Sequence, residues 1–285
     1  MAERGAGQTL IGCDFSSRPG KHKRIVIARG KLSRGTVWLD GFERLQSLEA
    51  FAYWLAQPGD WVGGFDLPFG LPRALVQHLG WSTDWESCIR HYAALSRPQI
   101  RQLFANFCNN RPAGGKFAHR ATDTPAGSSP SMKWVNPPVA YMLHAGVPLL
   151  IAAGVHLPGL HAGDRADVDV DGRSRRIALE TYPGLLAREV LGYKSYKSDD
   201  RAKQTSQRLE RRCQLLEALA SGQTRLKLRL ELDRSQREMI RGDASGDSLD
   251  AVLCLIQAAW GWQQGWPWFG LPTTMDPLEG WIVSA

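Results

Sequence analysis

The amino-acid sequence predicts an α/β protein, and three of its features support that fold class. β-Prone apolar runs at residues 9–16, 24–28 and 36–39 are separated by turn residues, which is typical of an antiparallel meander. Apolar residues at helical spacing over 45–55 then predict a helix, and a further β-prone run follows it and ends at Asp66. A helix between two strands suits a right-handed crossover onto the same sheet.

The rest of the chain alternates helical patterns with loops and shows neither an internal repeat nor a domain linker. We therefore expect a single domain over residues 1–285, with a helical and loop insertion at about 73–165. The insertion is expected to hold a loop at 111–138 and helices over 73–79, 84–95, 98–107 and 138–153. Asp171-Gly172 lies between β-prone runs at 166–170 and 175–181, which predicts a hairpin. Helices are then predicted over 184–191, 199–219, 225–232, 235–241 and 247–262. A last β-prone run covers 281–283.

The composition restricts the class of protein. The 285 residues are 43% hydrophobic and 22% charged, which is ordinary for a globular protein. Residues 1–9 show no signal-peptide pattern, and no stretch offers the ~18 uncharged apolar residues of a membrane span. The five cysteines are far apart and form no Cys-x-x-Cys pair, which argues against a zinc site and for reduced thiols. We therefore expect a cytoplasmic protein with no membrane partner.

The net charge of +7 is concentrated in one segment, since residues 194–241 carry 13 Lys or Arg and 7 Asp or Glu. A local basic surface suits a polyanion such as nucleic acid, although a solvated helical face is the commoner role of such a segment. The loop at 111–138 adds further basic residues, and loops often carry function. The residues expected to bind substrate are Ser16, Arg120, Lys133, Lys194 and Lys197.

Three carboxylates each follow a β-prone apolar run and precede a break in the strand pattern: Asp14, Asp66 and Glu180. Proline at 68 ends the second of these runs, because it has no N–H for a central sheet ladder. Carboxylates are rarely buried without a partner, so three at strand ends suggest one shared cation site. The alternative is three unrelated acids that end strands.

A second group of acids begins the last strong helix. Asp243, Asp247 and Asp250 are spaced i, i+4, i+7, so they can share one face, although acids in a first turn also favour the helix dipole. Together the predicted catalytic and metal-binding residues are Asp14, Asp66, Glu180, Asp247 and Asp250. Oxygen ligands of this kind suit Mg²⁺ or Mn²⁺, and one or two such ions can stabilise the oxygens of a phosphodiester in hydrolysis.

Five short motifs occur in order along the chain, at residues 12–16, 65–72, 180–183, 247–251 and 279–282. They read Gly-Cys-Asp-Phe-Ser, Phe-Asp-Leu-Pro-Phe-Gly-Leu-Pro, Glu-Thr-Tyr-Pro, Asp-Ser-Leu-Asp-Ala and Glu-Gly-Trp-Ile. This set resembles a widespread, uncharacterised bacterial and archaeal family of predicted nucleases with the ribonuclease H-like fold. The resemblance implies a mixed sheet, with an antiparallel first hairpin and then parallel strands, flanked by helices. It also implies that the five acids line the site.

The sequence thus predicts a metal-dependent nuclease that hydrolyses phosphodiester bonds with a carboxylate cluster. Two alternatives stay open. One is a non-catalytic nucleic-acid-binding protein that uses the basic segment and the Trp-rich residues of 265–285. The other is a nucleotide phosphohydrolase or ATP-binding protein of related fold, because that fold also begins with a strand that carries Gly-x-Asp.

Overall fold

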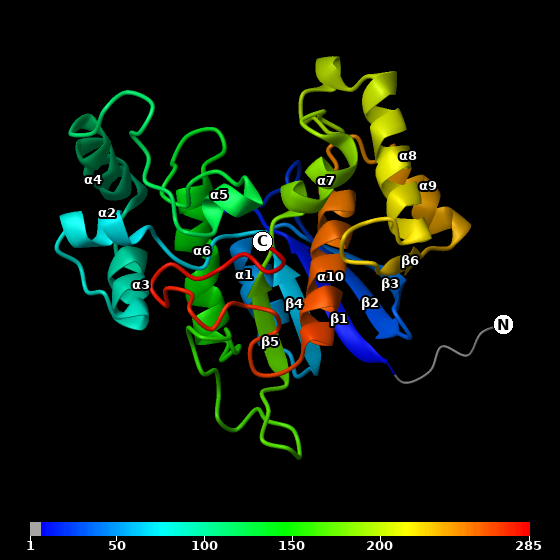
Figure 1. Cartoon of the computed structure of the whole chain (residues 1–285), viewed down its shortest axis with the longest axis horizontal. Coiled ribbons are helices and arrows are strands. Elements are labelled where there is room, and N and C mark those ends of the chain that lie inside the picture. Colours follow the sequence, from blue (N-terminus) through cyan, green and yellow to red (C-terminus); the bar gives the residue numbers. More distant parts are fainter. Residues whose placement is uncertain (1–6) are drawn as a thin grey trace.

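The computed structural model describes residues 7–285 and is built around a six-stranded mixed sheet (Figure 1). In chain order the strands are β1 (Gln8–Asp14), β2 (Ile25–Ser33), β3 (Thr36–Leu45), β4 (Trp61–Phe65), β5 (Arg176–Glu180) and β6 (Arg229–Glu231). Their order in the sheet is β5-β4-β1-β2-β3-β6. The first three strands are antiparallel, whereas β4, β5 and β6 each run parallel to the neighbour they join. The predicted α/β class is confirmed, as is the mixed sheet with an antiparallel first hairpin and then parallel strands, flanked by helices.

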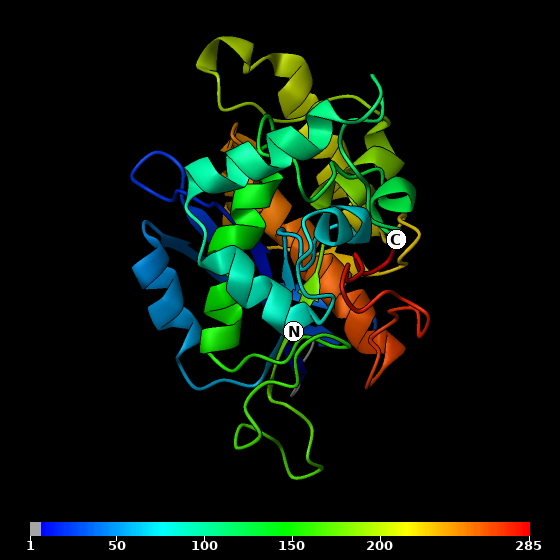
Figure 2. The same ribbon diagram turned by 90° about the vertical axis from the view of Figure 1, so that its left-hand side faces the viewer.

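Helices cover both faces of the sheet. One face carries α1 (Leu48–Leu55) and four helices between β4 and β5, namely α2 (Arg73–His78), α3 (Trp85–Ala93), α4 (Arg97–Asn109) and α6 (Val139–Ala152). The short α5 (Asp123–Ala126) lies in the loop before α6. The other face carries α7 (Pro183–Leu191), α8 (Ser206–Ser221), α9 (Arg234–Gly242) and α10 (Asp247–Gln264); η1 (Arg201–Lys203) precedes α8. Figure 2 looks onto the inserted helices, with the sheet behind them.

Side chains alternate along β1 between two separate cores, as the period of a strand requires. Ile11 and Cys13 belong to the core beneath α1 and the inserted helices, which we call the insertion side of the sheet. Leu10 belongs to the core beneath α7 to α10, which we call the α10 side. A strand covered on both faces explains why the run at 9–16 is apolar at consecutive positions.

Helix α10 lies unusually close to the sheet because two glycines face it. Gly12 of β1 pairs in register with Gly64 of β4. A Cβ added at Gly12 would overlap backbone atoms of Ala251 and Leu255, and one at Gly64 would overlap the carbonyl oxygen of Cys254. The backbone of α10 therefore rests directly on the two central strands, which brings the first turn of the helix over their ends.

Two elements differ from the sequence-based prediction. Residues 225–232 were expected to be helical but contain β6, which pairs with β3. Leu226, Leu228 and Leu230 are buried at every second position, and this period of two belongs to a strand. Residues 166–170 form no strand: the turn at 171–172 is present, but only the single bridge between Val168 and Ser174 closes it. An exposed Val170 shows that this run has no core to cover.

Smaller differences concern the helix at 199–219 and the run at 281–283. The helix begins at Ser206, after η1. The final run forms no strand, although the N–H of Val283 donates to the carbonyl oxygen of Glu180 at the end of β5. Most of the stretch 1–9, which shows no signal-peptide pattern, lies outside the described residues. Within residues 7–285, no helix has both the length and the apolar character needed to cross a membrane.

Candidate metal centre

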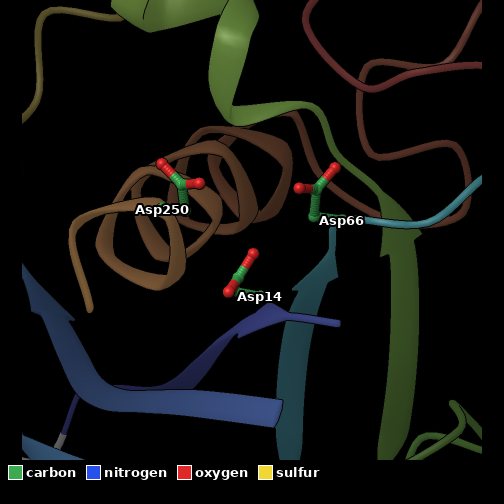
Figure 3. Close-up of side chains that lie close together, drawn as sticks. All are labelled: Asp14, Asp66 and Asp250. Carbon is green, nitrogen blue, oxygen red and sulfur yellow. The ribbon is translucent and has the colours of Figure 1, made fainter. Parts of the chain in front are cut away.

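Three carboxylates converge above the ends of the two central strands (Figure 3). Asp14 ends β1, Asp66 follows the last residue of β4, and Asp250 lies in the first turn of α10. One oxygen from each lies within 4.8 Å of the other two. We call these residues the carboxylate triad. Parallel register between β1 and β4 brings the two aspartates together, since Cys13 pairs with Phe65 and each aspartate is the next residue.

The triad is largely withdrawn from water. Asp14 is 6% exposed and Asp250 is fully buried, whereas Asp66 is half-buried. Oδ2 of Asp14 is buried and has no hydrogen-bond partner among residues 7–285. A buried carboxylate oxygen without a partner is costly, and a cation would satisfy it. The residues present therefore fit an oxygen-preferring ion such as Mg²⁺ or Mn²⁺.

Mutual repulsion and burial raise the pKa values of two triad members. Burial, together with the nearby Asp250, raises the pKa of Asp66 to about 7. Burial and Asp250 also raise the pKa of Asp14 well above its usual range, although the positive charges of Lys23 and Lys197 act in the opposite direction. Without a bound cation, the triad thus favours uptake of protons.

Two lysines partly offset this negative charge. Lys197 and the hydroxyl of Tyr196 each donate to the carboxylate of Asp250. Nζ of Lys23 lies 2.5 Å from Oδ1 of Asp247, beside the triad. Burial alone would lower the pKa values of both lysines, but Asp14 together with Asp247 raises that of Lys23, and Asp250 raises that of Lys197. Asp247 is therefore next to the triad but engaged by a lysine.

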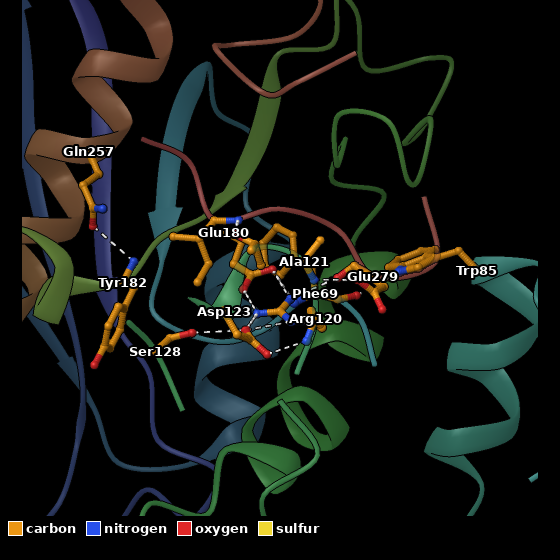
Figure 4. A network of polar contacts seen from close by, with 12 residues as sticks. Phe69, Trp85, Arg120, Ala121, Asp123, Ser128, Glu180, Tyr182, Gln257 and Glu279 are labelled. Atoms are coloured by element: carbon orange, nitrogen blue, oxygen red, sulfur yellow. Dashed lines mark hydrogen bonds and ion pairs between the residues drawn. The ribbon is translucent and has the colours of Figure 1, made fainter. Parts of the chain in front are cut away.

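Glu180 does not join the triad; it forms a buried ion pair instead (Figure 4). Its two oxygens accept from Arg120 at 2.6 and 2.9 Å, and the N–H of Phe69 donates to one of them at 2.9 Å. The sheet register explains this, because Glu180 pairs with Phe65, whose side chain points to the insertion side, whereas α10 lies on the other. The prediction of Glu180 as a metal ligand does not agree with this placement.

Arg120 is likewise committed to the fold and is not free to bind substrate. It is 2% exposed, and besides Glu180 it donates to Asp123 at 3.0 and 3.1 Å and to the carbonyl oxygen of Glu279 at 3.0 Å. The carboxylate of Glu279 in turn accepts from the N–H of Ala121. This Arg120 network ties the long loop before α6 to the end of β5 and to the C-terminal segment.

The other predicted substrate-binding residues lie in different places. Ser16 lies two residues after Asp14 and lines a surface groove. Lys194 is exposed in the segment that leads to α8, and Lys197 contacts the triad. Lys133 is half-buried in the loop before α6 and lines none of the described cavities near the triad. No sequence pattern pointed to Lys23, which lies in the loop after β1, or to Tyr196 as a partner of Asp250.

A cavity of about 310 Å³ opens beside Asp66. Its apolar wall includes Leu67 and Met142, and its polar wall includes Thr181 and Lys197. Its volume is at the lower end of the range for small-molecule sites. The cavity can therefore hold a compact group whose polar end faces the triad.

Comparison with protein-family models, with curated proteins and with solved structures finds no match for this chain. A function is therefore inferred from the geometry of its own residues.

Proposed function

We propose that this protein is a metal-dependent phosphodiesterase that cleaves nucleic acid at the carboxylate triad. The observation that carries the proposal is Oδ2 of Asp14, a buried oxygen without a partner within a group of three converging carboxylates. A site of this charge without a cation would repel a phosphodiester. One or two Mg²⁺ or Mn²⁺ ions, held by Asp14, Asp66 and Asp250, would supply Lewis-acid activation of the phosphodiester.

The chain's own residues supply position and charge around that reaction. Lys23 and Lys197 place positive charge on two sides of the triad, where charge develops on the phosphate oxygens. The first turn of α10 is held against the sheet by Gly12 and Gly64, so Asp250 is fixed before substrate binds. The 310 Å³ cavity beside Asp66 can receive the nucleoside next to the scissile phosphate and exclude water from it.

The same cavity favours a second candidate, a nucleotide phosphohydrolase. A space of about 310 Å³ suits a single nucleotide better than a long polymer. The two candidate activities use the same triad and differ only in the substrate, which is a nucleic-acid chain in one and a single nucleotide in the other. The free thiols of all five cysteines, four of them buried, support a cytoplasmic location for either activity.

A cleavage screen tests the proposal. Purified protein with Mg²⁺ or Mn²⁺ is offered single-stranded, duplex and branched DNA, RNA, RNA–DNA hybrids and nucleoside triphosphates. We expect cleavage of at least one polymer, and a loss of at least about 100-fold in Asp14→Asn and Asp250→Asn, because even outer partners of metal ligands contribute 10–100-fold. Asp171→Asn, in the exposed turn before β5, is the matched control and should keep full activity. Cleavage of nucleotides alone would favour the phosphohydrolase.

Metal binding is tested separately from activity. Mn²⁺ should stabilise the wild type by RT ln(1 + [L]/Kd), about 2.7 kcal/mol at a hundredfold excess over Kd. Asp14→Asn should lose most of this gain in thermal unfolding, whereas Asp171→Asn should keep it. Equal metal stabilisation of wild type and Asp14→Asn would refute the metal centre. Nucleic-acid binding with no cleavage of any substrate would favour the non-catalytic binding protein.

A further inference from the structure

A surface groove of about 1010 Å³ lies between the loop after β1 and the N-terminal half of α4, two segments that Figure 2 shows side by side. We call it the basic groove. Four of its lining residues are cations, and none carries a carboxylate. The residues that matter here are Ser16, Arg18, Lys23, Arg97, Arg101 and Tyr141.

Three guanidinium groups in the basic groove have no acidic partner. Within residues 7–285, no ion pair includes the exposed Arg18 and Arg101 or the half-buried Arg97. Half-buried Arg73 and buried Arg176, by contrast, pair with carboxylates. Arg97 is nevertheless held in place: it donates to the carbonyl oxygen of Ser17 at 2.7 Å and stacks on Tyr141 at 4.8 Å. A guanidinium group held in place without a counter-ion, with two exposed guanidinium groups in the same groove, suits an anionic ligand, and phosphate above all.

The basic groove is linked to the triad by residues that lie next to both. Asp14 leads through Phe15 directly into Ser16, which lines the groove. Lys23 also lines the groove, and its ammonium group contacts Asp247 next to the triad. A chain of phosphates with one phosphodiester at the triad would therefore have its neighbouring phosphates in the groove.

The basic segment at 194–241 offers a weaker surface for phosphates. Many of its cations are already engaged: Arg211 donates to the carbonyl oxygen of Ser195, and buried Arg212 to those of Tyr196 and Arg241. Arg225 pairs with Glu189. Much of the positive charge of this segment therefore takes part in hydrogen bonds and ion pairs that stabilise the segment.

We propose that the basic groove binds the sugar-phosphate backbone of the nucleic acid that is cleaved at the triad. This inference rests on the proposed function, because it assigns the path of that enzyme's substrate. Affinity in such a groove comes from release of counter-ions as Arg18, Arg97 and Arg101 neutralise phosphates, so it depends on salt and little on base sequence.

The test measures binding without cleavage. Fluorescence anisotropy measures the binding of a labelled 20-nucleotide single-stranded DNA, its duplex and the RNA of the same sequence. All proteins carry Asp14→Asn, and a chelator is present, so that no cleavage occurs. The double charge reversal Arg18→Glu/Arg101→Glu changes two exposed side chains that form no hydrogen bond or ion pair within residues 7–285. We expect at least a tenfold loss of affinity at low salt. The slope of log K against log salt should fall by about 1.4 for single strands or about 1.8 for duplex.

The matched control is Arg208→Glu/Arg211→Glu on α8, which makes the same charge change on the basic segment. It should change affinity by less than threefold. Equal losses from both double variants would show a general charge effect and overturn the groove. Tighter binding of inorganic polyphosphate than of the oligonucleotides would overturn the assignment to nucleic acid. If the reversal unfolds the protein, Arg18→Gln/Arg101→Gln is measured with the same criteria.

This experiment is separable from the test of the triad. Triad variants should lose cleavage but keep binding in the basic groove, and groove variants should lose binding without losing the stabilisation by Mn²⁺. Groove binding without any cleavage would refute the phosphodiesterase alone. Cleavage with affinity unaffected by Arg18→Glu/Arg101→Glu would refute the groove alone.

Discussion

The ammonium group of Lys197 donates a hydrogen bond to the carboxylate of Asp250, and this pair joins a partly exposed residue to a fully buried one. The side chain of Lys197 is 41% exposed, whereas that of Asp250 is 0% exposed. Lys197 therefore reaches into the triad from the solvent side and supplies one positive charge there. A metal ion and Lys197 interact with the same carboxylate, so each should weaken the other's contribution.

Lys197→Gln should lower the stability of the metal-free protein and increase the gain from metal. Loss of one partner of a buried pair costs about 3–5 kcal/mol, and the exposure of Lys197 reduces this to about 1–3 kcal/mol. Urea unfolding with chelator and with Mn²⁺ measures both quantities. Lys194→Gln, which removes an exposed lysine without an ion pair in residues 7–285, is the control and should change neither. A smaller metal-dependent gain in Lys197→Gln would contradict competition for Asp250.

The triad should make the metal-free protein less stable as the pH rises. The pKa of Asp66 in the folded protein is about 7, above its unfolded value of about 4, so the folded state holds this proton more tightly. The resulting stabilisation is complete below pH 4 and is lost between about pH 4 and 7. Its size is at most about 4 kcal/mol, and the partial exposure of Asp66 reduces it.

Asp66→Asn removes this titration, so the variant and the wild type should have similar stability at pH 4, and the variant should be the more stable at pH 8. Denaturant unfolding with chelator at both pH values measures the difference. A constant difference across this range would show that Asp66 has an ordinary pKa. Saturating Mn²⁺ should remove the advantage of the variant, because the ion stabilises only the intact triad.

Glu180 and Asp14 should give opposite results on substitution by the amide. Glu180→Gln leaves the guanidinium of Arg120 without a full counter-charge in the core and should cost about 3–5 kcal/mol. Its stabilisation by Mn²⁺ should equal that of the wild type. Asp14→Asn should keep the metal-free stability and lose the metal-dependent gain. Thermal unfolding with and without Mn²⁺ separates the two, and loss of the metal effect in Glu180→Gln would return this residue to the metal centre.

The close approach of α10 gives a further prediction. Gly12→Ala places a methyl group where Ala251 and Leu255 already lie, and overpacking of this kind costs about 1–3 kcal/mol or more. Because the helix must shift, Asp250 should leave the triad and the stabilisation by Mn²⁺ should fall. Gly41→Ala is the matched control in β3, since its added Cβ would meet nothing within 4 Å among residues 7–285 apart from its own chain neighbours. Equal effects of the two substitutions would mean that α10 can adjust without moving Asp250.

Much of the fold was predictable because its signals are local. Buried strands such as β1 and β4 are continuous apolar runs, and α10 begins at an acidic turn before an apolar stripe. β6 could not be predicted in this way, because the strand has only three residues and lies between two segments of helical composition. The alternation of Leu226, Leu228 and Leu230 around β6 is visible in the sequence, but three positions are too few to decide between a strand and a helix.

The site was only partly predictable. Asp14, Asp66 and Asp250 converge as expected. The first two each follow an apolar strand, and the ends of two parallel strands lie at the same edge of the sheet. Glu180 has the same motif, but the side of the sheet to which it points depends on a register that no local pattern contains. The unpaired cations of the basic groove come from two separate segments, residues 15–24 and 97–109, and each has a smaller excess of basic residues than 194–241. Composition therefore directed attention to residues 194–241 instead.

The Arg120 network also sets an order of events during synthesis. Arg120 is buried with Asp123, but its other partners are Glu180 and the carbonyl oxygen of Glu279, and the hydroxyl of the neighbouring Thr122 accepts from the N–H of Ile282, all much later in the chain. At 5–20 residues per second, a ribosome needs roughly 10–30 s to pass from residue 120 to residue 282. Throughout that interval the nascent chain has a charged loop that cannot yet dock. The half of the molecule beside the triad therefore acquires its final form only after translation has passed residue 282.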